Sequence, residues 1–213
     1  MPRIPAAERR AALIDAGLRL IARDGLAQAT TRAIVAEAGM SLASFHYAFE
    51  SRDAFLDELI AVVVANEQQA VLPALDVGPD GGGADGGDGD GGDHDLRAIL
   101  EDGLLRYLDH LASDPEHEQA MLELTQYALR SPERHPLAVA QYRRYAELAE
   151  QALATAAERA GAAWREPVAE AAGVLVAFTD GITLTWLVHR DDAAARAAAR
   201  AAADALSRMA DPA

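Results

Sequence analysis

Residues 30–49 read TTRAIVAEAGMSLASFHYAF and predict two short helices joined by a sharp turn. Thr30 and Ser41 each stand just before a helical run, where a hydroxyl can accept a hydrogen bond from a first-turn N–H group. Gly39 lies where the first helix should end, in the left-handed conformation that glycine adopts without steric cost. We therefore expect helices over about residues 31–38 and 42–48, arranged as a helix-turn-helix.

The second of these helices has two chemically different faces. Leu42, Phe45 and Phe49 have the spacing of a buried apolar stripe. The opposite face carries small or hydrogen-bonding side chains, which allow a helix to enter the major groove of DNA. These residues are Ala43, Ser44, His46 and Tyr47.

An amphipathic helix is expected upstream, over about residues 8–24. Its inner face carries Leu13, Gly17, Leu20 and Ile21. Glycine weakens a helix, so Gly17 indicates close packing against a neighbouring helix. Three arginines at the start of the chain could reach a phosphate or the minor groove. They are Arg3, Arg9 and Arg10.

The segment from Leu13 to Leu59 resembles the DNA-binding domain of the TetR family of bacterial repressors. Its matching motifs are RDG (23–25) at the end of the first helix, TTR (30–32), the turn AGMS (38–41), and SRD (51–53) opening a fourth helix. The resemblance implies a helix-turn-helix DNA-binding domain over residues 1–51 and a linker helix over 52–75. A helical domain for effector binding and dimerisation would cover residues 96–213, giving about nine helices in all.

The resemblance places the DNA contacts in and around the helix-turn-helix. Phosphate contacts are expected from Thr31, Ser41, Tyr47 and Arg52. The last of these stands at a helix start, where backbone N–H groups also favour phosphate. Base-edge contacts are expected from Ser44, His46 and Arg32. Thr30, Leu42 and Ala43 complete the predicted DNA-binding set.

The net charge of −15 is unusual for a DNA-binding protein. Residues 1–60 hold seven Arg against eight Asp or Glu, a net of −1, which leaves −14 for the rest of the chain. Residues 1–23 hold five Arg against two acidic residues, a net of +3. Local charge, not the total, meets phosphate, so we expect weak and strongly salt-sensitive binding to non-specific DNA.

Residues 76–95, DVGPDGGGADGGDGDGGDHD, contain nine Gly and seven Asp. This composition cannot form a core and its like charges repel, so we expect a disordered acidic loop. Calcium binding is an alternative, because Gly/Asp repeats form such sites in β-rolls, but the repeat period and interleaved strand residues are absent. Pro73 is expected to end the linker helix before this loop.

From Leu96 onwards the pattern is helical and no strand is expected. Apolar periodicity and capping residues predict helices over about 95–112, 116–130, 134–160, 167–190 and 193–209. The helix at 167–190 is apolar on all sides, so part of its cover should come from a second chain. We predict a homodimer in which the last two helices of each chain form a four-helix bundle, as the resemblance also implies. The predicted interface residues are Val174, Leu184, Leu187, Val188 and Leu206.

The resemblance also implies an effector pocket among the C-terminal helices. Candidate lining residues combine aromatic walls with a few hydroxyl groups, as small-molecule sites usually do. They are Leu104, Tyr107, Met121, Leu124, Thr125, Tyr142, Tyr145, Phe178, Thr179, Ile182 and Trp186. Asp180 lies in an apolar stretch, where it is either a polar anchor for a ligand or a group facing solvent or a partner Arg. Charged residues expected to face the lumen of this pocket are few, which favours an apolar or neutral effector.

These features predict a dimeric transcriptional repressor that binds a palindromic operator in double-stranded DNA and is released by a small-molecule effector. An enzyme is the second possible class, but the sequence has no nucleophile elbow, metal-binding helix pair or nucleotide loop. A helical interaction module without effector-controlled DNA binding is the third. His46 and Ala48 keep that alternative open, because they depart from the residues usual at these positions in the family.

We expect no metal and no cofactor. The six His residues lack metal-ligand spacing, and the absence of Cys leaves no thiol chemistry. No signal peptide and no apolar run of membrane-spanning length are recognised in the sequence. These features predict a cytoplasmic protein with no membrane partner.

Overall fold

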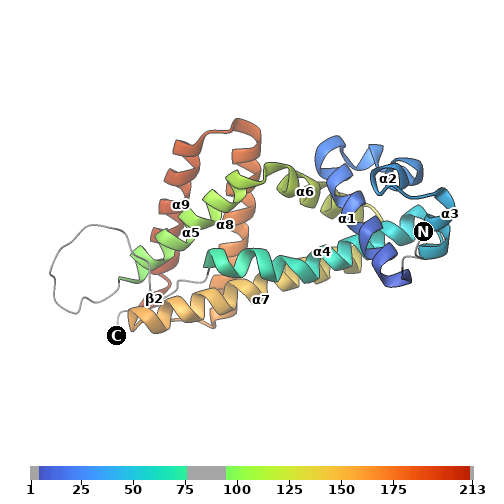
Figure 1. The fold of residues 1–213 in the computed structure, drawn as a ribbon. Helices are drawn as coiled ribbons and strands as arrows, with labels where there is room; N and C mark the ends of the chain where they lie inside the picture. The colour runs from blue at the N-terminus through green and yellow to red at the C-terminus, as the bar shows by residue number, and fades with distance from the viewer. Residues whose placement is uncertain (1–4, 76–94, 212–213) are drawn as a thin grey trace. The chain divides into compact units, whose positions relative to one another are not determined.

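The computed structural model describes residues 5–75 and 95–211, with side chains described for 5–63 and 95–211. Nine α-helices occupy most of these residues, which confirms the predicted all-α fold (Figure 1). They are α1 (Ala6–Asp24), α2 (Thr31–Glu37), α3 (Leu42–Ala48), α4 (Arg52–Leu75), α5 (Leu96–Ser113), α6 (Pro115–Leu129), α7 (His135–Ala160), α8 (Val168–His189) and α9 (Asp192–Ser207). A 3₁₀ turn, η1 (Leu26–Gln28), joins α1 to α2. The predicted acidic loop lies, apart from Asp95, outside the described residues.

Side-chain caps explain where three of these helices begin. The Thr30 hydroxyl accepts a hydrogen bond from the N–H of Ala33 at 3.2 Å, at the start of α2. Asp114 caps α6 through the N–H of His117 at 3.1 Å, and Pro115 occupies the first turn, where a missing N–H costs nothing. Asp191 caps α9 in the same way, at 3.0 Å from a backbone nitrogen of its first turn.

Two details of the secondary structure differ from the sequence-based expectation. The helix α4 continues to Leu75 and therefore passes Pro73, which was expected to end it. A proline close to a helix end removes only one late hydrogen bond, so the last turn can persist beyond it. Two short strands, β1 (Ala163–Trp164) and β2 (Ala210–Asp211), form an antiparallel pair where no strand was predicted. Two residues are too few to show the alternation that identifies a strand in a sequence.

The chain folds into two compact units, and the first comprises Met1–Asn66 and Asp114–Gln141. Its core contains three mutually packed rings, with the centroid of Phe55 5.6 Å from that of Phe45 and 5.1 Å from that of Phe49. The helix α6 belongs by sequence to the predicted effector domain, and in the fold it packs against α1 in this unit. The carboxylate of Glu123 on α6 accepts a hydrogen bond of 2.5 Å from the N–H of Leu26. Buried apolar residues of α6 therefore share a core with the helix-turn-helix.

The second unit comprises Glu67–Ser113 and Tyr142–Ala213. Its core is formed mainly by α5, α8 and α9, and α9 contacts both of the other helices. Alanines on α9 are buried at the contact, including Ala199 and Ala203 at 0% exposure, and their small side chains allow the helices to approach closely. The β1–β2 pair joins the segment after α7 to the end of the chain.

Among the described residues, one helix, α8, is long and apolar enough to cross a membrane by length and composition alone. This corrects the expectation that no apolar run reaches that length. A core helix of a folded protein passes the same test, and α8 packs against α9 through its buried side. The helix also carries Asp180 near its middle, and a charged side chain is costly at the centre of a bilayer.

Candidate functional site

The helix α3 turns its apolar stripe inward and its polar face outward. Phe45 and Phe49 are 0% and 3% exposed, and both belong to the core of the first unit. Tyr47 is 84% exposed, which leaves its ring and hydroxyl available to a partner. Leu42, Ala43 and His46 are also exposed, and Ser44 is half-buried. The face that the sequence assigned to DNA is therefore open on the surface of the first unit.

The turn between α2 and α3 holds this face in place. Gly39 has φ 62°, the left-handed conformation that was predicted for it. The N–H of Met40 returns to the carbonyl of Val35 at 2.8 Å and closes the end of α2. Ser41 then caps α3, since its hydroxyl oxygen lies 3.2 Å from the N–H of Ser44.

Arg52 and Arg10 are engaged inside the first unit. The Arg52 guanidinium donates to the carbonyl oxygens of Ala29 at 2.7 Å and Leu26 at 2.8 Å, so it fastens the start of α4 to the η1 turn. Arg10 is bound to Glu58 and lies over the ring of Phe49, 4.5 Å from its centroid. These contacts give both side chains a structural role in the first unit.

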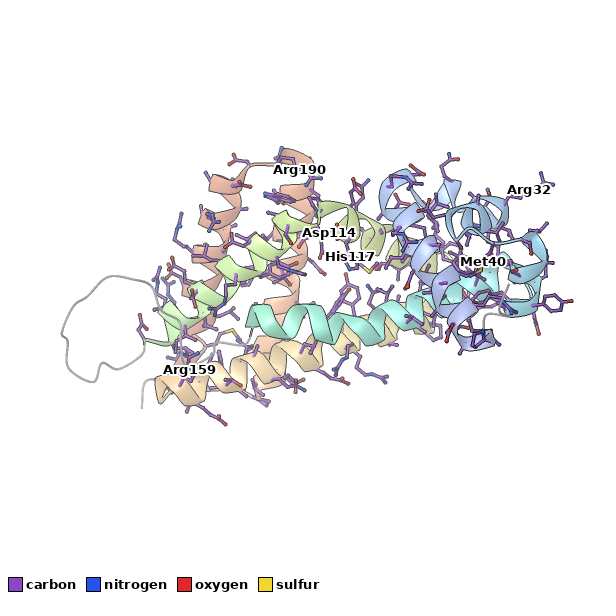
Figure 2. The ribbon with its side chains drawn as sticks, in the orientation of Figure 1. Arg32, Met40, Asp114, His117, Arg159 and Arg190 are labelled. Atoms are coloured by element: carbon purple, nitrogen blue, oxygen red, sulfur yellow. The ribbon has the colours of Figure 1, made fainter. Side chains whose placement is uncertain are left out.

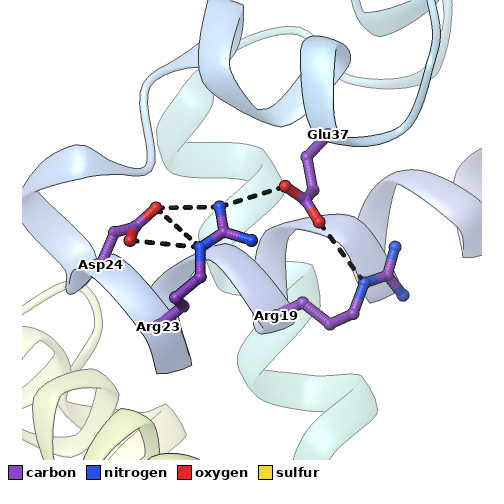
Figure 3. A network of polar contacts seen from close by, with 4 residues as sticks. All are labelled: Arg19, Arg23, Asp24 and Glu37. Atoms are coloured by element: carbon purple, nitrogen blue, oxygen red, sulfur yellow. Dashed lines mark hydrogen bonds and ion pairs between the residues drawn. The ribbon is translucent and has the colours of Figure 1, made fainter.

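Two more arginines of α1 are tied into an ionic network with α2 (Figure 3). Glu37 lies 3.7 Å from Nε of Arg19 and 3.1 Å from Nη2 of Arg23, which also pairs with Asp24 at 2.9 Å. Ion pairs within the chain therefore neutralise part of the positive charge of residues 1–23 in the DNA-free protein. A small number of available cations is consistent with the expected weakness of non-specific binding.

Arg32 differs from these arginines. It lies in the first turn of α2, is exposed, and has no ion-pair partner within the described part of the chain (Figure 2). Its guanidinium is therefore available to a phosphate or to a guanine edge, for which its paired donors are suited.

The pocket candidates of the second unit make two hydrogen bonds between helices. Tyr107 on α5 shares a hydrogen bond of 2.5 Å with Thr183 on α8. The Tyr142 hydroxyl on α7 donates to Oδ2 of Asp180 on α8 at 2.9 Å, and its ring centroid lies 5.5 Å from that of Tyr145. Burial and the hydrogen bond to Asp180 together raise the pKa of Tyr142 to about 12. Sequence reasoning missed Thr183, although it lies on the same side of α8 as Asp180, three residues away.

Three other pocket candidates are in the core of the first unit. Met121 and Leu124 are 5% and 2% exposed and pack with the residues of the helix-turn-helix. The Thr125 hydroxyl donates to the carbonyl of Met121 at 2.9 Å and contacts Oε1 of Gln141 at 3.0 Å. These side chains therefore pack in a core separate from the one that holds the α8 candidates.

The remaining candidates are mostly core residues of the second unit. Leu104 and Ile182 are buried, and Phe178 is half-buried. The Thr179 hydroxyl donates a hydrogen bond to carbonyl oxygens of its own helix. Trp186 donates from Nε1 to Asp192 at 2.7 Å and borders a cavity of about 330 Å³ with charged side chains from α5 and α9. Those charged residues, Asp109 and Arg196, were not recognised in the sequence as candidates.

The outer side of α8 carries small and apolar side chains. Leu184 and Val188 are 54% and 67% exposed. Gly173, Ala177 and Gly181 are exposed on the same side of the helix. Val174 and Leu187 are half-buried at its edges. Leu206 is 0% exposed inside the protomer, so its predicted place in a dimer interface is corrected.

An exposed polar helix, held by a glycine turn on a three-helix core, defines a DNA-binding protein of the helix-turn-helix class. Residues 13–59 match the profile of the bacterial regulatory proteins of the tetR family. Residues 96–211 match the profile of the C-terminal domain of BetI-type transcriptional repressors. The chain belongs to the tetR family, whose members are transcriptional regulators, and it combines a DNA-binding and a ligand-binding domain.

Relatives extend over nearly the whole chain. The HTH-type nicotine-responsive transcriptional repressor HdnoR of Paenarthrobacter nicotinovorans is 29% identical over 192 residues, which cover 89% of each chain. The multidrug binding protein EbrR complexed with imidazole is 26% identical, with a TM-score of 0.63 and 97% of each chain covered. EbrR complexed with ethidium is 25% identical with the same TM-score, over 96% of this chain and 99% of EbrR.

Proposed function

We propose that this protein is a homodimeric cytoplasmic repressor that binds a palindromic operator and leaves it when a small molecule binds the C-terminal unit. The observation that carries the proposal is the outward polar face of α3, in a chain that belongs to a family of DNA-binding regulators. No catalytic step is part of this function. The nicotine-responsive repressor and the EbrR complexes support a small-molecule effector.

In this proposal α3 of each subunit lies in the major groove, and the two half-sites are separated by about 34 Å or somewhat more. Thr31, Ser41 and Tyr47 contact phosphates, and Ser44, His46 and Arg32 contact base edges. Thr30, Leu42 and Ala43 form the rest of the surface that faces DNA. Arg52 acts indirectly, because its guanidinium is already bonded to two carbonyl groups.

The two subunits associate through the outer side of α8 and the adjacent α9. The exposed side of α8 offers two large apolar residues, Leu184 and Val188, beside glycine and alanine positions where another helix can approach closely. Burying such a surface against its copy gives a symmetric interface. Light scattering of the purified chain at micromolar concentration should give the mass of a dimer. Leu184→Glu should shift that mass toward the monomer, whereas Val139→Glu, at a site 52% exposed on the first unit, should not.

The DNA-binding proposal is tested by selecting bound duplexes from a random pool and measuring their affinities by gel shift. Tyr47→Ala and His46→Ala should each weaken binding to the selected duplex at least about 10-fold, which corresponds to a lost contact of about 1.4 kcal/mol. Val139→Ala is the control outside the α3 face. Failure to select any duplex, or unchanged affinity in both α3 variants, would reject the operator-binding function and favour a helical interaction module.

A further inference from the structure

Tyr142 on α7 contacts two side chains in the second unit, Tyr145 on the same helix and Asp180 on α8. The Tyr142 hydroxyl lies 2.9 Å from Oδ2 of Asp180. The rings of Tyr142 and Tyr145 are 5.5 Å apart at an interplanar angle of 65°, which is an edge-to-face arrangement. Tyr142 is 39% exposed in the protomer, and Asp180 lies with Leu187 at the edge of the α8 side proposed for the dimer, so part of the Tyr142 ring is accessible to another molecule.

The charge of Asp180 has no counterion within the described part of the chain. Other aspartates of the same unit have one, for example Asp102 with Arg106 at 2.7 Å and Asp109 with Arg196 at 2.5 Å. Among the described residues Asp180 accepts a hydrogen bond from Tyr142 alone, which uses one of its two oxygens. Neighbouring groups remove enough water to raise the pKa of Asp180, although the Tyr142 hydroxyl acts in the opposite direction.

A carboxylate beside two tyrosine rings is suited to an organic cation. The negative faces of aromatic rings attract a positive charge, and the carboxylate adds an ion pair or charge-assisted hydrogen bond. A calcium or magnesium ion would require about six oxygen ligands, and this cluster supplies one carboxylate and one phenol. An anion would be repelled, and a neutral molecule would leave the carboxylate without a counterion.

We propose that the effector is an organic cation, a protonated amine or a quaternary ammonium, held by the Asp180 carboxylate and the rings of Tyr142 and Tyr145. This inference rests on the proposed function, because it names the ligand class of the same effector site. It replaces the sequence-based expectation of an apolar or neutral effector. The relatives support it, since one responds to nicotine, an amine, and another is complexed with ethidium, a cation.

The test uses the full-length protein without DNA. Binding of ethidium is followed by fluorescence anisotropy, binding of tetraethylammonium by calorimetry, and phenanthridine serves as a flat, uncharged comparator. Asp180→Asn preserves the shape of the side chain and removes its charge. It should therefore lower the affinity for both cations at least about 10-fold and leave the affinity for phenanthridine unchanged. Asp109→Asn also removes one acidic charge from the second unit. It is the matched control and should leave the affinity for both cations unchanged. Tyr142→Ala should lower the affinity for the cations, and Tyr142→Phe should retain most of that affinity because it retains the ring.

The inference is overturned if neither cation binds the wild-type protein with a Kd below about 1 mM, or if Asp180→Asn binds both cations as the wild type does. Circular dichroism of Asp180→Asn should match that of the wild type, because the substitution preserves the size and shape of the side chain. Operator binding is measured separately, by gel shift with tetraethylammonium, since ethidium would intercalate into the duplex. A protein that binds its operator but shows no Asp180-dependent cation binding would refute the ligand class alone. A protein that binds cations through Asp180 but no duplex would refute the repressor function alone.

Discussion

Replacing Gly17 with alanine should destabilise the first unit, because a new methyl group would overlap a buried ring. An ideal Cβ at Gly17 would overlap Cζ of Phe55 and lie 3.0 Å from its Cε1 and 3.3 Å from Cδ1 of Leu59. Phe55 and Leu59 are both 0% exposed. The Phe55 ring also packs against Phe45 and Phe49, so it has little room to move.

The size of the effect follows from two opposing terms. Alanine favours a helix over glycine by about 1 kcal/mol. Overpacking a rigid core costs about 1–3 kcal/mol, and the interlocked rings around Phe55 place Gly17 toward the upper end of that range. We therefore expect a net loss of about 1–2 kcal/mol in the free energy of unfolding. The melting temperature should fall by about 2–4 °C for each kcal/mol in a chain of this length.

Gly103→Ala is the matched control for this experiment. Gly103 lies in the helix α5, and a Cβ there would meet nothing within 4 Å, so the helix preference should appear without a clash. Urea and thermal unfolding followed by circular dichroism should show Gly103→Ala to be as stable as the wild type or more stable, and Gly17→Ala to be less stable. Equal stabilisation by both substitutions would refute the close approach of α1 and α4 at Gly17.

Three further predictions concern single side chains. Ser41→Ala should cost about 1 kcal/mol of stability through loss of the α3 cap, measured by urea unfolding, and Ser41→Asp should recover most of it because aspartate also caps helices. Arg52→Ala and Arg52→Lys should both lower the melting temperature, since lysine cannot bond two carbonyl groups in the same fork geometry; a normal melting temperature in Arg52→Ala would contradict the structural role. Tyr142 should titrate near pH 12, and its raised folded-state pKa means that the stabilisation it contributes is complete below about pH 10 and is lost as the pH rises through about 12. Phenolate absorbance should show an earlier titration in Asp180→Asn, and an unchanged curve would argue against the Tyr142–Asp180 hydrogen bond.

Local features of the first unit could be predicted because they depend on neighbouring residues. Thr30, Ser41 and Gly39 specify two helix starts and one left-handed turn, and each was found in the predicted conformation. The spacing of Phe45 and Phe49 is sufficient to turn the opposite face of α3 outward. These interactions join residues a few positions apart, so the local sequence is enough to predict them.

Contacts between distant residues were decided by the tertiary structure. The sequence marks Met121 and Thr125 as apolar and hydroxyl-bearing residues of a helix, but only packing places them in the core of the first unit. Leu206 looks the same in the sequence whether it faces its own chain or a partner, and the structure buries it completely.

The charged residues illustrate the same division most clearly. Composition alone determined that the N-terminal segment is rich in arginine. Only the fold paired Arg10 with Glu58 and Arg23 with Glu37, left Arg32 without such a partner among the described residues, and brought Tyr142 to Asp180 across 38 positions of sequence. The physical reason is that hydrogen bonds and ion pairs require side chains to meet within a few ångströms, and the distance between helices is set by the packing of the whole core.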